Sequence, residues 1–177
     1  VPAVIRMSRE VRAPATAWRD DLASSGGVIL DLAIHEFDWL LWTIGPAARV
    51  FARGVCRNGG DAHTYALISL RFANGAIAHV ESSMVRSTGP HVYGEVAGDG
   101  GLVTYDSDLD TPLKSDLSAE DAMWEGLPTT YTEASPFVLQ LQHWVRCIQG
   151  REQAAVPPEE ACAALRVALA ALQSAQT

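Results

Sequence analysis

Two alternating segments joined by a short turn constrain the fold of this chain more than any other feature. Thr64 to Phe72 and Ala76 to Met84 alternate apolar with polar residues on either side of Ala73-Asn74-Gly75, a pattern typical of a β-hairpin. Two registers are compatible with the turn. A two-residue Asn-Gly turn pairs Phe72 with Ile77, and this register mixes polar and apolar side chains on both faces.

The other register is a three-residue loop with a left-handed Gly75, which pairs Phe72 with Ala76 and separates the faces. One face then gathers seven apolar residues: Ala66, Ile68, Leu70, Phe72, Ala76, Ala78 and Val80. The other face carries Tyr65, Ser69, Arg71, His79 and Glu81, together with Leu67 and Ile77. Because only this register gives the sheet one apolar face, we predict the three-residue loop.

Further periodic segments surround the hairpin. Alternation predicts strands over Val4–Val11, His91–Ala97 and Leu102–Tyr105, whereas three- and four-residue spacing predicts three helices. The first helix begins near Ser25 and ends at Gly45-Pro46, the second covers Pro136–Gln149, and the third begins at Pro158. The predicted fold class is α+β, with a predominantly antiparallel open sheet and helices packed on one of its faces.

Composition supports a packed domain and excludes several function classes. Of 177 residues, 48% are hydrophobic and 19% charged, so the chain can build a core and is not disordered. The net charge of -8 argues against nucleic-acid binding. Arg166 interrupts the most apolar stretch, so no membrane span is predicted, and no signal peptide is recognisable. The cysteines, Cys56, Cys147 and Cys162, form no CxxC pair, which favours the reducing cytoplasm over a disulfide scaffold.

The first predicted helix carries the clearest chemical motif. In an α-helix, Asp31, His35 and Asp38 share one face and form a polar stripe among apolar residues, which suggests partial burial. A carboxylate beside a histidine orients the imidazole and favours its protonated form, an arrangement suited to proton transfer near pH 7.

Other interpretations of this stripe remain open at the level of the residues. It can be a satisfied polar network without function, or an Asp-His-Asp metal site, although no further ligand cluster accompanies it and we predict no metal. A serine hydrolase would need a GxSxG turn and a dinucleotide site a GxGxxG turn between strand and helix, and the sequence contains neither.

Several motifs, in order, resemble one known family. They are Trp18-Arg19, the string from Ser25-Gly26-Gly27 through Asp31 and His35 to Asp38, Phe72-Ala73-Asn74-Gly75-Ala76, Val92–Val103, Phe137–Gly150 and Pro157–Ala161. Together they resemble the C-terminal domain of the glucose–fructose oxidoreductase/inositol dehydrogenase/rhizopine-catabolism (Gfo/Idh/MocA) family. The resemblance covers nearly the whole chain and implies a sheet domain like the C-terminal domain of glyceraldehyde-3-phosphate dehydrogenase.

The resemblance also implies a function. It implies an oxidoreductase that transfers hydride between NAD or NADP and a sugar, polyol or inositol-like hydroxy compound. Asp31 and His35 then take the catalytic positions that bind substrate hydroxyls and handle the proton. Trp18, Arg19 and Asp38 are candidate substrate-binding residues that adjoin them.

The chain departs from the family pattern in one large respect. It has no Gly-rich nucleotide loop and no Glu-Lys-Pro motif, and its single lysine, Lys114, matches no catalytic position. We therefore expect residues 1–177 to be a C-terminal substrate-binding and oligomerisation domain, inactive alone, whose N-terminal Rossmann domain binds the cofactor. The open sheet face is expected to form a homo-oligomer. The alternatives are a non-catalytic binding or regulatory module of the same fold and a metal-dependent hydrolase or isomerase.

Overall fold

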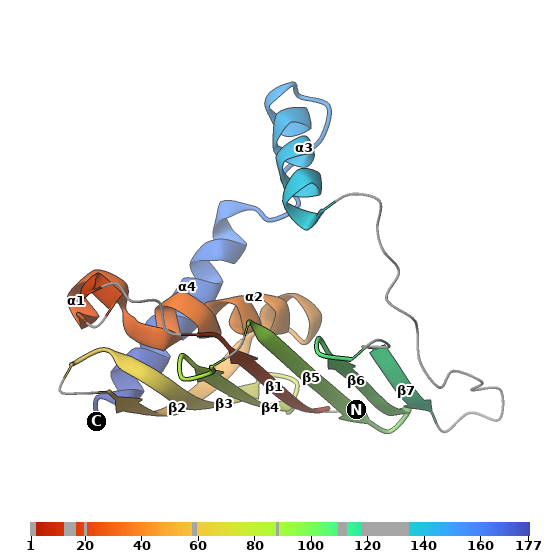
Figure 1. Cartoon of the computed structure of the whole chain (residues 1–177). Helices are drawn as coiled ribbons and strands as arrows, with labels where there is room; N and C mark the ends of the chain where they lie inside the picture. Colours follow the sequence, from red (N-terminus) through yellow and green to blue (C-terminus); the bar gives the residue numbers. More distant parts are fainter. Residues whose placement is uncertain are drawn as a thin grey trace.

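A computed structural model describes residues 3–12, 17–19, 21–57, 60–87, 89–109, 113–117 and 135–177. Its centre is a seven-stranded sheet in the order β2-β3-β4-β1-β5-β6-β7 (Figure 1). The strands are β1 Val4–Glu10, β2 Ala47–Cys56, β3 His63–Phe72, β4 Ile77–Ser83, β5 His91–Gly98, β6 Gly101–Asp106 and β7 Leu113–Leu117. Every adjacent pair is antiparallel except β1 with β4, so the predominantly antiparallel sheet is confirmed, with one parallel pair at its centre.

The hairpin between β3 and β4 has the three-residue loop that the sequence predicts. Leu70 lies opposite Ala78, and the Phe72 N–H donates to the Ala76 carbonyl at 2.9 Å. Gly75 adopts a φ of 91°, which favours glycine, and the Asn74 side chain accepts the Ala76 N–H. All seven apolar residues of the predicted face are buried.

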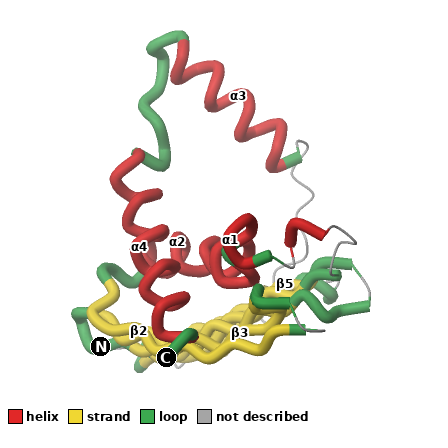
Figure 2. The backbone as a smooth tube through the Cα atoms, turned by 90° about the vertical axis from the view of Figure 1, so that its left-hand side faces the viewer, coloured by secondary structure: helices red, strands yellow, loops and turns green. Residues whose placement is uncertain are grey.

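A layer of helices covers that face. The α2 helix, Ile34–Thr43, and the α4 helix, Pro158–Ala175, lie together on one side of the sheet, whose other side they leave open (Figures 1 and 2). Small residues let α4 approach closely, since Ala164, Ala168 and Ala171 are its buried positions. Near its C-terminal end, the Ser174 hydroxyl accepts the Ala52 N–H of β2 at 3.0 Å.

The helix predicted from Ser25 is divided into shorter pieces. A short helix, α1 Leu22–Ser25, is capped by Asp21 and ends at Gly26, whose φ of 68° is left-handed. Ser25 is therefore the last residue of α1 rather than the cap of the next helix, although its hydroxyl accepts the Gly27 N–H. A π-helical turn, η2 Ile29–Ala33, then leads into α2, which ends before Gly45 as predicted.

One helix does not join the layer. The α3 helix, Pro136–Ile148, has no buried residue and stands away from the sheet in Figure 1. Its apolar residues Phe137, Leu141, Trp144 and Ile148 are all exposed. The prediction of helices packed on one face thus holds for α2 and α4 and not for α3. Among the helices that the structure describes, none is long and apolar enough to cross a membrane.

Candidate active site

The predicted site residues fall into two groups, the first of which surrounds Asp31. Arg19 comes from a 3-10 turn, η1 Ala17–Arg19, and its Nη2 lies 3.5 Å from Asp31 Oδ2. The Arg19 guanidinium also stacks 5.1 Å from the centre of the Trp18 ring, which is half exposed. This cation–π contact holds Arg19 in place above Asp31.

The Arg19 and Asp31 side chains each have an atom without a hydrogen bond to the described residues. Arg19 Nε and Asp31 Oδ2 are buried, yet neither has a hydrogen-bond partner among the described residues. About a quarter of each side chain remains exposed. In their exposed parts, a guanidinium donor beside a carboxylate acceptor suits a hydroxyl group, which donates and accepts at once.

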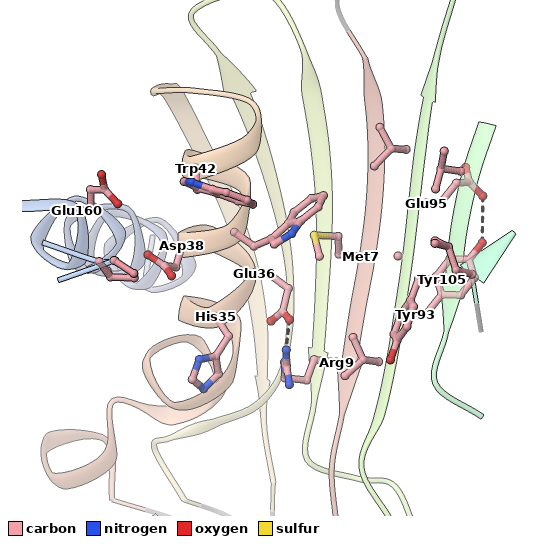
Figure 3. Close-up of a pocket in the computed structure, with 18 residues that line it drawn as sticks. Met7, Arg9, His35, Glu36, Asp38, Trp42, Tyr93, Glu95, Tyr105 and Glu160 are labelled. Atoms are coloured by element: carbon pink, nitrogen blue, oxygen red, sulfur yellow. Dashed lines mark hydrogen bonds and ion pairs between the residues drawn. The ribbon is translucent and has the colours of Figure 1, made fainter. Parts of the chain in front are cut away.

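The second group comprises His35 and Asp38, which line a cavity of about 740 Å³. His35 is the second residue of α2 and is exposed, whereas Asp38 is partly buried. The stripe that the sequence predicts as partly buried is therefore open to solvent at its histidine. In Figure 3, Asp38 points from α2 toward Glu160 of α4, on the side of α2 away from β1 and β5, and His35 projects near the N-terminal end of α2.

The cavity lies between α2 and the β1, β5 and β6 strands. Its walls are largely apolar and aromatic: Met7, Trp39, Trp42, Val92, Val96, Val103 and Tyr105. Gly94 of β5 widens it, because a Cβ added there would meet nothing within 4 Å. An apolar cavity with a few convergent polar groups is the usual form of a small-molecule site.

A partly buried ion pair contributes to the lining of the cavity. Arg9 of β1 donates from Nε to Glu36 Oε1 of α2 at 2.7 Å, and Figure 3 shows the two side chains pointing toward one another. Only 1% of Glu36 is exposed, and its Oε2 has no partner among the described residues. Burial raises the pKa of Glu36, and the charge and hydrogen bond of Arg9 oppose that rise.

The two groups do not meet as an ideal α-helix would place them. Asp31 lies in the π turn, where the backbone bond spans one residue more than in an α-helix, so its direction relative to His35 is changed. No hydrogen bond or ion pair joins Asp31 to His35 in the described part of the chain. Asp31 is instead grouped with Trp18 and Arg19, and His35 with Asp38 and the cavity.

The sequence interpretation missed Arg9 and Glu36, although both interrupt a pattern. Arg9 has the same strand parity as the core residues Ile5 and Met7, and Glu36 lies one helical turn from Leu32 and from Leu40. A charged residue at an apolar position is a signal of a buried pair. This signal in the sequence could have identified Arg9 and Glu36 separately, but not the contact between them.

Comparison with known proteins assigns the family. The model of the GFO/IDH/MocA C-terminal domain matches residues 2–104. Scyllo-inositol 2-dehydrogenase (NAD(+)) of Bacillus subtilis is 28% identical over 160 residues, which are 85% of this chain and 46% of that protein. Myo-inositol 2-dehydrogenase of Thermotoga maritima is 32% identical over 119 residues, which are 63% of this chain and 35% of that protein. The chain thus spans about half the length of the curated relatives or less.

Solved structures share the fold. Levoglucosan dehydrogenase in complex with NADH and L-sorbose superimposes with a TM-score of 0.79 at 16% identity, and the match covers 98% of this chain and 56% of that one. The order of motifs, the sheet topology and the matched family model agree. The chain belongs to the GFO/IDH/MocA family and carries its C-terminal domain.

Proposed function

We propose that this chain is the substrate-binding half of an oxidoreductase that transfers hydride between NAD or NADP and a sugar, polyol or inositol-like hydroxy compound. The observation that carries the proposal is the cavity beside His35 and Asp38, whose aromatic walls suit the CH faces of a ring. The inositol dehydrogenases among the relatives support the same class of substrate.

His35 and Asp31 have separate tasks in this proposal. The exposed imidazole of His35 accepts the proton of the reacting hydroxyl, which keeps the forming carbonyl neutral. Asp31 and Arg19 bind a neighbouring hydroxyl through the exposed parts of their side chains, with Trp18 holding Arg19 in place. Asp38 binds a substrate hydroxyl at the border of the cavity.

The described residues do not suit the nicotinamide cofactor itself. The Gly-rich turn Gly98 to Gly101 joins β5 to β6, and Gly26-Gly27 follows the short helix α1, whereas pyrophosphate binding needs a turn between a strand and a helix N-terminus. The chemistry that a nicotinamide supplies is hydride transfer. We therefore assign its binding to an N-terminal Rossmann domain, with residues 1–177 as the C-terminal substrate-binding and oligomerisation domain, inactive alone.

The test is the substitution His35→Ala in the complete protein. We expect turnover to fall by roughly 10²-fold or more while cofactor affinity stays near normal, because a general base acts only on the chemical step. His79→Ala is the control for the loss of an exposed histidine outside the cavity, and its oligomeric state is measured alongside, since His79 lies on the open sheet face. Unchanged turnover in His35→Ala would remove the role given to His35.

The open sheet face supports a second part of the proposal, a homo-oligomer. Tyr65, Arg71, His79 and Glu81 lie on this face beside exposed apolar residues, namely Phe51, Val55, Leu67 and Ile77. Exposed apolar side chains rimmed by polar ones are typical of protein interfaces. Sedimentation should therefore show a dimer or larger species, and a monomer at high micromolar concentration would contradict this part.

A further inference from the structure

We propose that the cavity selects an uncharged polyhydroxy ring over an anionic one, because Glu36 neutralises Arg9, the one arginine or lysine among the described side chains that line it. This inference rests on the proposed function and specifies the substrate class further. It concerns the difference between a neutral sugar or cyclitol and its uronate or phosphate. Three observations support this selectivity: the arrangement of Arg9, the charges of the residues that line the cavity, and the apolar surfaces of its walls.

The Arg9 guanidinium is hydrogen-bonded through Nε, whereas its two Nη groups face no hydrogen-bond partner among the described residues. Its Nε donates to Glu36 Oε1 at 2.7 Å, and Glu36 is fixed by burial in the helix layer. The two Nη groups have no partner among the described residues, and 28% of the Arg9 side chain is exposed. Arg9 therefore presents fixed N–H donors to the cavity, spaced so that adjacent hydroxyl oxygens can accept from them.

The net charge around these donors is negative. Three acidic side chains face the cavity, those of Glu36, Asp38 and Glu160, whereas Glu95 pairs with Arg6 on the open face of the sheet. Glu36 compensates Arg9. Asp38 and Glu160 have no ion-pair partner in the described part of the chain, so two negative charges remain. A carboxylate or phosphate on the ligand would lie among like charges in a cavity with largely apolar walls, where repulsion is weakly screened.

The remaining surface is suited to a neutral ring. Trp39, Trp42 and Tyr105 provide flat apolar surfaces, and Gly94 leaves space beside them. Ring CH groups pack on such surfaces while ring hydroxyls reach the polar groups. Arg9 donates to hydroxyl oxygens, and Asp38 accepts from hydroxyl groups. Hydroxyl groups of an uncharged ring can thus pair with Arg9 and Asp38 without bringing a new charge into the cavity.

The experiment compares matched ligands on the complete protein at pH 8, where histidine side chains are ordinarily neutral. The pairs are glucose with glucuronate, galactose with galacturonate and mannose with mannuronate, and myo-inositol joins the neutral set. Binding is measured by calorimetry and turnover by the appearance of NADH or NADPH. We expect the best neutral ligand to bind at least tenfold more tightly than its uronate. A uronate that binds as well as its neutral partner overturns the inference, and so does the failure of every neutral ligand to bind.

The two readouts separate this inference from the proposed function. Neutral ligands that bind but are not oxidised, with either cofactor, count against the oxidoreductase and leave the charge selectivity standing. Turnover that is as fast with uronates as with neutral sugars supports the oxidoreductase and refutes the selectivity.

A variant tests the role of Glu36 directly. Glu36→Gln keeps an oxygen for the Arg9 Nε–H and removes the neutralising charge, so the ratio of neutral to uronate affinity should fall at least fivefold. Asp99→Asn removes one negative charge from the exposed β5–β6 turn, outside the cavity, and should leave the ratio unchanged. A loss of stability would lower affinity for both ligands and would not move their ratio. An unchanged ratio in a folded Glu36→Gln protein refutes the role of the pair.

Discussion

Replacing Arg9 with methionine removes the counter-ion of a carboxylate that is only 1% exposed. Glu36 then loses the hydrogen bond to Oε1, and its Oε2 already has no partner among the described residues. Breaking a buried ion pair by removing one partner costs about 3–5 kcal/mol, because the remaining charge stays buried. Since 28% of the Arg9 side chain is exposed, we expect a loss at the lower end of this range, about 3 kcal/mol at pH 7.

The loss should depend on pH in a defined direction. Burial raises the pKa of Glu36 from its ordinary value of 4.5, and Arg9 opposes that rise. Without Arg9 the pKa of Glu36 in the folded chain rises further, so the folded state holds a proton that the unfolded state has released. The free energy of unfolding of the variant therefore increases as the pH falls from 7 toward 4.5. The difference from the parent chain shrinks over the same interval.

Urea unfolding of the chain, followed by circular dichroism at pH 7 and pH 5, measures both effects. Arg6→Met is the matched control on the same strand, because Arg6 is 63% exposed and its pair with Glu95 lies on the open face. An exposed pair of this kind contributes less than about 1 kcal/mol. The double variant Arg9→Met/Glu36→Leu should regain most of the lost stability, since it leaves no buried charge. A decrease in the free energy of unfolding by Arg9→Met that is no larger than the decrease by Arg6→Met would refute the reasoning. So would a decrease by Arg9→Met that is the same at pH 7 and pH 5.

Three further predictions concern other parts of the chain. Gly27→Ala should cost more than about 2 kcal/mol of unfolding free energy, because Gly27 has a φ of 64° and its Cβ would lie 2.9 Å from the His63 backbone nitrogen. Gly98→Ala, with open space around its Cβ, should cost much less in the same urea assay. Trp144→Ser should change the stability of the chain by under about 0.5 kcal/mol, because α3 has no buried residue, whereas Phe37→Ala in the core should cost about 3–5 kcal/mol. Equal losses in that pair would mean that α3 packs against the domain. Titration of the chain with NADH or NADPH, followed by nicotinamide fluorescence, should show no binding up to millimolar concentration. Micromolar binding would contradict the proposal that the cofactor is bound by a Rossmann domain outside residues 1–177.

Local pattern was sufficient for most elements of the fold. The β3–β4 hairpin was predictable to the exact residue pairing, because only one register of this sequence gives an apolar face and because Gly75 can adopt a positive φ. The limits of α3 and the start of α4 were predictable from their prolines and from helical periodicity. The parallel pairing of β1 with β4 was not, since strand order depends on contacts between residues far apart in the chain.

The candidate site divides in the same way. Residue type and spacing were enough to single out Asp31, His35 and Asp38, because a polar stripe on an apolar helix is visible in the sequence alone. The grouping of those residues was decided by the tertiary structure, since a π turn redirects Asp31 and places it against Arg19. Arg9 and Glu36 each interrupt an apolar pattern, but they are 27 residues apart. Only the packing of α2 on β1 brings their opposite charges within 2.7 Å, because a buried charge is stable only beside a partner that the fold supplies.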